Sequence, residues 1–153
     1  MMNRGYTIIE ILIGIAIIII LISAVGIPFK QLNDRQSLVK ETAHIVSILG
    51  HARSQTLSSK GGVQHGVHIE SAQVVLFSGS VYDQNDPNNV SIPLHPLVNI
   101  SNINLALGSS DVIFDRLTGT TPFFGTLTVS LVASSTQSKV ITINSTGIVD
   151  SNL

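Results

Sequence analysis

The order of apolar and polar positions divides the chain into three stretches with different periods. Residues 11–29 are uncharged and nearly all apolar, and with Ile8 and Ile9 the run is long enough to cross ~30 Å of hydrocarbon as a helix. From Lys30 to about Ser58 the apolar residues recur every three or four positions, and beyond Gly62 they alternate. The pattern therefore predicts an apolar helix, then an amphipathic helix, then strands.

The amphipathic stretch predicts a helix with one face turned toward a sheet. Gly61 and Gly62 are expected to end this helix. Pro28 removes one backbone hydrogen bond, so a helix kink is expected there. The expected packing stripe consists of Leu32, Val39, Ala43, Val46, Leu49 (or Gly50), Arg53 and Leu57.

The alternating stretch predicts a meandering antiparallel sheet. Pro93 and Pro96 predict irregular chain around them. The expected fold is α+β: a long N-terminal helix, with a transmembrane half and an amphipathic half, packed on one antiparallel sheet. The expected strands lie at residues 63–69, 73–77, 98–105, 112–115, 125–132, 139–144 and 148–149.

Composition excludes several classes of function. Eight Lys and Arg residues against nine Asp and Glu residues give a net charge of −1, which is no electrostatic footprint for nucleic acid. The chain has no cysteine, so neither disulfides nor thiol chemistry are available. Arg4 lies in the short segment before the apolar run, and the positive-inside tendency predicts a cytoplasmic N-terminus.

One charge interrupts the apolar run. A carboxylate such as Glu10 costs ~2–3 kcal/mol near the centre of a membrane helix and less near the headgroups, so a partner is expected. Cleavage after Gly5 would free the α-amine of Tyr6, four residues before Glu10. That amine, from the same chain or from a neighbour shifted along its axis, is a candidate ion partner.

The segment Gly5-Tyr6-Thr7-Ile8-Ile9-Glu10, with the apolar run after it, resembles the prepilin processing signal of type IV pilins and type II secretion pseudopilins. The resemblance implies that a prepilin peptidase cuts after Gly5 and methylates Tyr6, where the family usually has Phe, and that Glu10 is the assembly glutamate. The alternative is an ordinary membrane anchor with an accidental Glu10. The implied organisation is a leader (1–5), a transmembrane or filament-core helix (6–29), an amphipathic half-helix (30–60) and a β ectodomain (61–153).

The rest of the chain is similar to the GspH/FimT group of minor pilins and pseudopilins. The similar segments are residues 52–56, 66–69, 113–115 with Gly119, and 143–149. The resemblance implies a structural subunit of a secretion pseudopilus or a type IV pilus. It also implies a bacterial inner-membrane location with an extracytoplasmic ectodomain. The implied partners are the peptidase, other filament subunits and exported cargo.

Candidate chemistry is sparse. His65 and His68 are three apart, a spacing that points their rings to opposite faces of a strand and argues against a shared zinc ion. Asp83 and Asp86 lie in an oxygen-rich loop, residues 83–89, whose spacing fits no EF-hand, and whether it binds an ion stays open. No catalytic set is apparent, so we expect neither enzyme activity nor a metal or other cofactor.

Two further functions are alternatives to the filament subunit. One is a competence pilin that binds DNA for uptake. Some members of the FimT side of the family bind DNA through basic C-terminal residues, but residues 147–153 contain no Arg or Lys. An anchored enzyme lacks a site. The sequence leaves open which machine is served, the position in the filament and the cargo.

Overall fold

The structure is a computed structural model that describes residues 5–152, apart from the side chains of residues 24–31 and 60. The chain divides into two compact units, Met1–Asp34 (unit 1) and Arg35–Leu153 (unit 2). The first helix, α1 (Ile8–Leu57), contributes to both units. The kink predicted at Pro28 falls among the side chains outside this description.

In unit 1 the apolar residues of α1 are exposed. The large ones among the described side chains, from Ile8 to Ile22, are each more than half exposed. Within the described part of the chain, no helix is long and apolar enough to cross a membrane. The predicted transmembrane half of the fold is therefore wrong for these residues.

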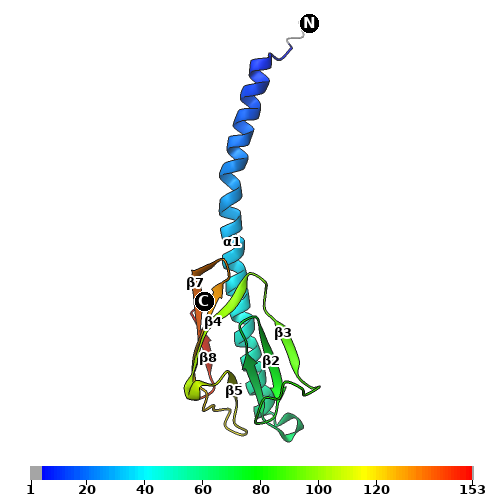
Figure 1. The fold of residues 1–153 in the computed structure, drawn as a ribbon, viewed down its shortest axis with the longest axis vertical. Coiled ribbons are helices and arrows are strands. Elements are labelled where there is room, and N and C mark those ends of the chain that lie inside the picture. Colours follow the sequence, from blue (N-terminus) through cyan, green and yellow to red (C-terminus); the bar gives the residue numbers. More distant parts are fainter. Residues whose placement is uncertain (1–4, 153) are drawn as a thin grey trace. The chain divides into compact units, whose positions relative to one another are not determined.

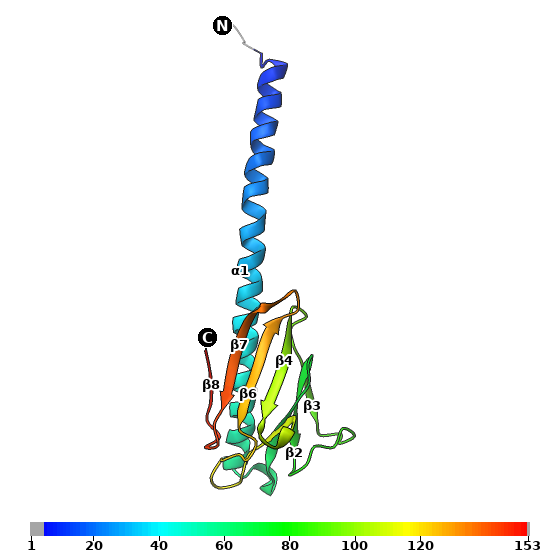
Figure 2. The same cartoon turned by 60° about the vertical axis from the view of Figure 1, so that its left-hand side comes forward.

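Unit 2 contains two antiparallel sheets of four strands each (Figures 1 and 2). The first sheet has the order β3 (Val90–Pro93), β2 (Gln73–Ser78), β1 (His65–Ile69), β5 (Asp111–Ile113). The second has the order β4 (Val98–Leu105), β6 (Gly125–Leu131), β7 (Ser134–Ile143), β8 (Val149–Ser151), which lie side by side in Figure 2. Two short 3-10 turns, η1 (Lys60–Gly62) and η2 (Ala106–Gly108), complete the elements.

The prediction of a single sheet is wrong. Alternation of apolar residues shows which face of a strand is buried, but it does not say which strand lies beside it. Here β5 follows β4 in the chain, yet it returns to pair with β1 in the other sheet, in the register Val67↔Val112. The chain around Pro93, expected to be irregular, forms β3, and Pro93 is tolerated because β3 is an edge strand.

The second half of α1 packs against both sheets, but not through the predicted stripe. Val39 and Leu57 are partly exposed, and the buried face lies one position away from the expected one. The buried threonines explain the difference, because Thr42 and Thr56 donate their hydroxyls to the carbonyls of Leu38 and Ala52, at 2.8 and 3.0 Å, and so need no water. A hydropathy pattern counts both as polar. The buried face consists of Leu38, Thr42, Ile45, Ile48, Leu49, Ala52 and Thr56.

A polar clamp joins the end of α1 to two distant loops. Nε of Arg53 donates to the carbonyl of Gly119 at 3.0 Å, and its Nη2 donates to the carbonyl of Thr146 at 3.3 Å. Gly147 has φ = 76°, and a Cβ there would lie 1.8 Å from the Gly119 oxygen. Only glycine fits this position without displacing the clamp.

Candidate functional site

The predicted cleavage site lies outside the helix. Gly5, Tyr6 and Thr7 precede α1 and have no regular secondary structure. Gly5 is exposed, and the side chain of Tyr6 is 81% exposed. The Gly5–Tyr6 bond is therefore exposed and lies outside the helix. The cleavage and the methylation at Tyr6 stay predictions.

Thr7 and Glu10 form the start of the helix. The N–H of Glu10 donates to the hydroxyl of Thr7 at 3.3 Å and lies 3.1 Å from its carbonyl oxygen. Thr7 is thus the N-cap, and Glu10 is the third residue of the helix, the spacing of a capping box. This role was missed in the sequence, although the pattern Thr-x-x-Glu is readable there.

Glu10 also has a favourable electrostatic position. A carboxylate in the first turn of a helix is stabilised by the partial positive charge of the helix N-terminus, by ~0.3–1 kcal/mol at an exposed site. Among the described residues Glu10 makes no ion pair. The carboxylate therefore remains able to take a cation from outside the unit.

Apolar side chains before and after Glu10 surround α1. Their exposed fractions lie between 51 and 81%. A helix that is apolar on every side is stable when other apolar groups surround it. The twelve residues are Ile8, Ile9, Ile11, Leu12, Ile13, Ile15, Ile17, Ile18, Ile19, Ile20, Leu21 and Ile22.

The two histidines of β1 are held apart. His65 is buried, and its Nδ1 lies 3.1 Å from the hydroxyl of Ser78. His68 is hydrogen-bonded to Asp111 and stacks on Tyr82, with ring centroids 4.0 Å apart. In the described residues no group of three or more His, Cys, Asp or Glu residues could hold a metal ion.

The cluster around His68 fixes the loop after β2. Nε2 of His68 lies 3.7 Å from a carboxylate oxygen of Glu70. Burial, and then the charges of Glu70, Asp111 and Asp83, raise the pKa of Tyr82 above its usual value of 10.0. The loop at residues 83–89 bonds to itself, since Asp83 accepts from the N–H of Asn85 at 2.9 Å. We assign structural roles to the loop and the cluster, because their polar side chains are hydrogen-bonded or paired within unit 2.

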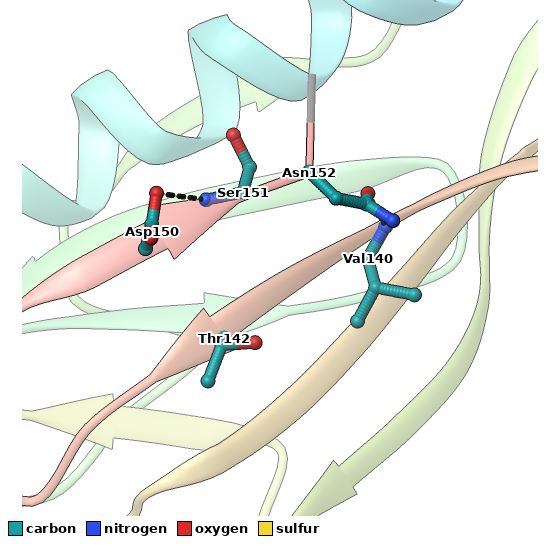
Figure 3. Close-up of a pocket in the computed structure, with 5 residues that line it drawn as sticks. All are labelled: Val140, Thr142, Asp150, Ser151 and Asn152. Carbon is teal, nitrogen blue, oxygen red and sulfur yellow. Dashed lines mark hydrogen bonds between the residues drawn. The ribbon is translucent and has the colours of Figure 1, made fainter.

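A shallow cavity of about 350 Å³ lies over the ends of β7 and β8 (Figure 3). It is lined by Val140, Thr142, Asp150, Ser151 and Asn152, and the carboxylate of Asp150 accepts from the N–H of Ser151 at 2.7 Å. Among the described residues, neither a histidine nor a cationic side chain lines it, and we assign it no role.

Comparison with known proteins adds no assignment. No protein-family model, no curated protein and no solved structure matches the chain. The features that bear on function are therefore the segment that contains Gly5, Tyr6 and Glu10 and the exposed apolar residues of α1.

Proposed function

We propose that this protein is a structural subunit of a pilin-like filament, a minor pilin or pseudopilin of a type IV pilus or a type II secretion pseudopilus. One observation supports this above all: the helix of unit 1 is apolar on every side, exposed, and begins with a single carboxylate at Glu10. The similarity of residues 5–10 to the prepilin processing signal supports the same conclusion.

The distribution of apolar side chains favours several neighbours over one. A single partner covers one face of a helix, whereas twelve exposed Ile and Leu residues here occupy all faces between residues 8 and 22. Burying such a side chain completely is favourable by ~1.5–3 kcal/mol, and half of this gain summed over twelve residues is a large driving force. A filament core, in which each helix is surrounded by the helices of other subunits, provides that burial.

Glu10 then selects the register of assembly. In the proposed mechanism prepilin peptidase, acting at the bacterial inner membrane, cleaves after Gly5 and methylates the amine of Tyr6. As a subunit enters the core, its Glu10 pairs with the terminal amine of a neighbour. Opposite charges ~4 Å apart attract strongly inside an apolar bundle because screening there is weak. Unit 2 is carried on the outside, where it contacts other subunits or exported cargo.

The test is Glu10→Gln, with Glu41→Gln as the matched control. Glu41 is a helical glutamate of unit 2, 3.4 Å from His44, and its substitution makes the same chemical change. In the full chain, expressed in its own cells, Glu10→Gln should leave processing intact and reduce crosslinking to other filament subunits at least about tenfold. Glu41→Gln should do neither.

Intact mass decides the processing step separately. The expected mature chain begins at Tyr6 and carries one added methyl group. A chain that retains Met1, or that begins beyond residue 20, would rule out prepilin processing. Equal crosslinking by Glu10→Gln and the unaltered chain would rule out docking through this carboxylate. The competence alternative, DNA uptake, has no support from charge, because residues 147–153 lack Lys and Arg.

A further inference from the structure

The loops at one end of unit 2 expose large apolar side chains. This is the end at which α1 finishes, and both η2 and the loop between β5 and β6 lie there in the two views (Figures 1 and 2). Four side chains of these loops are between half and about four-fifths exposed. We call them the tip patch: Leu107 (82%), Leu117 (83%), Phe124 (50%) and Ile148 (57%).

Hydrogen bonds hold the loops of the tip patch together. The N–H of Ala106 donates to the carbonyl of Phe124 at 2.8 Å, so η2 lies beside the end of the loop that precedes β6. The N–H of Thr121, in the same loop, donates to the carbonyl of Ser145 at 3.0 Å, in the connection between β7 and β8. The Arg53 clamp joins these last two segments again. The tip patch therefore belongs to one connected set of loops.

Two members of the tip patch have an unfavourable backbone conformation. Leu107 has φ = 65° and Leu117 has φ = 72°. Among the described residues other than glycine, only Ser59 also has a positive φ. A Cβ crowds the backbone in this conformation, so glycine and, to a lesser degree, asparagine are the residues that adopt it readily. The same two leucines have the most exposed large apolar side chains in the described part of unit 2.

Neither property of the two leucines contributes to the fold. The positive φ destabilises each turn, and a side chain that is more than 80% exposed gains almost no burial in return. Residues that break a local preference without a compensating contact inside the fold are typical of functional sites. Burial against another molecule would supply the missing compensation.

The charge of these loops indicates which class of molecule fits the tip patch. Residues 106–110, 116–124 and 144–148 contain a single charged residue, Arg116. Nucleic acids and anionic lipid surfaces are bound through several Lys and Arg residues. The surface that complements the tip patch is therefore an uncharged, apolar surface of a protein.

The area of the tip patch argues for a different protein over a second copy of the chain. Four side chains with these exposures present on the order of 400 Å² of apolar surface. A standard interface takes about 800 Å² from each partner, and somewhat more than half of it is apolar, which the tip patch matches. Obligate homodimers bury about 2,000 Å² or more in total, so two tip patches facing each other would be too small.

We propose that the tip patch docks unit 2 onto a partner protein of different sequence, whose uncharged apolar surface takes Leu107 and Leu117 into pockets. Side chains that are fully desolvated in pockets contribute most of the binding energy of an interface. Both leucines stand on turns with a fixed backbone, so little conformational freedom is lost when they bind. The inference goes beyond the filament proposal and does not rest on it, because the partner is defined by its chemistry.

The test places a photo-crosslinking amino acid at Ser145, an exposed residue beside the tip patch, in the full chain expressed in its own cells. Leu107→Asn and Leu117→Asn replace an apolar side chain by a polar one that accepts the positive φ, so each turn is kept. We expect each to lower crosslinking about tenfold. Leu107→Met and Leu117→Met keep an apolar side chain of similar size and should retain most of the crosslinking.

The matched control is Val132→Asn, in the turn between β6 and β7 at the opposite end of unit 2 (Figure 2). Val132 is also an exposed apolar residue, and this variant should crosslink like the unaltered chain. The Leu→Asn variants should melt at or above the temperature of the unaltered chain, which separates lost docking from unfolding.

The identity of the adduct completes the test. The expected adduct joins Ser145 to an apolar, uncharged peptide of another protein, and replacing an apolar residue of that peptide by Asp should remove it. Adducts that form equally in the Leu→Asn variants would overturn the proposal. So would adducts that lie within one chain, join two copies of it, or contain only lipid or nucleic acid.

Discussion

The two halves of α1 differ in apolar content and have opposite surroundings. In residues 8–22 the large apolar side chains are all more than half exposed, whereas in unit 2 Ile45, Leu49 and Ala52 are completely buried. The difference lies in what covers them. Unit 2 supplies two sheets to one face of its helix, whereas in the described part of unit 1 no other element covers the helix.

A hydroxyl group in each half nevertheless makes the same kind of hydrogen bond, to the carbonyl four residues earlier in the helix. Ser23 donates to the carbonyl of Ile19 at 2.8 Å, as Thr42 donates to that of Leu38. In each case the helix itself satisfies the polar atom, so the hydroxyl does not need water. The hydroxyls of Ser23 and Thr42 therefore do not oppose an apolar environment around their halves of the helix.

The strongest test of this contrast compares the same substitution in each half. Ile45→Ala should lower the free energy of unfolding by about 4 kcal/mol, because it leaves a cavity among α1 and both sheets. Ile15→Ala, at a side chain that is 51% exposed, should change it by less than ~0.5 kcal/mol. Chemical denaturation of the full chain in mild detergent measures both. Similar losses in the two variants would mean that the first half is already packed within one chain.

The sequence predicts part of this contrast. Period and turn residues locate β1 and β2 around a turn at residues 70–72, and the end of α1 lies close to Gly61 and Gly62. The predicted packing face of α1 lies one residue away from the observed one. The pattern counts Thr42 and Thr56 as polar, but their hydroxyls are hydrogen-bonded to carbonyls of the helix and are buried. The division into two sheets could not be predicted from the sequence, because pairing between strands far apart in the chain leaves no local pattern. The same holds for the Arg53 clamp, whose partners Gly119 and Thr146 are 66 and 93 residues away.

A second test concerns how tightly unit 2 is closed around its half of α1. Gly147→Ala should cost about 3 kcal/mol, since it combines a left-handed backbone with a clash against the Gly119 carbonyl. The matched control is Gly62→Ala, where φ is 69° and the added Cβ meets nothing within 4 Å. Its expected cost is only ~1 kcal/mol. Thermal melts of the two variants separate the cost of the clash from the cost of the positive φ. Equal melting points would mean that the loops held by Arg53 can move to accommodate the added Cβ.

The smallest effect is expected where unit 2 also exposes an apolar residue. Leu117 is 83% exposed and has φ = 72°, a conformation that costs a leucine ~1–2 kcal/mol. Glycine removes this cost but has a more flexible unfolded chain, so Leu117→Gly should raise stability by about 0.5 kcal/mol. Ile148→Gly, at an exposed residue without a positive φ, should lower it by a similar amount. Opposite shifts of the denaturation midpoint are the expected result, and a loss in both variants would contradict it.

The Arg53 clamp also sets an order of events during synthesis. Arg53 is made early, but the carbonyl that its Nη2 contacts belongs to Thr146, 93 residues later. The loop that Gly147 closes, and β8 after it, leave the ribosome long after Arg53 does. Until they arrive, the end of α1 lacks one of its two anchors, and the chain cannot complete its native contacts. A protein truncated before Thr146 would therefore remain in the open state through which every nascent copy passes.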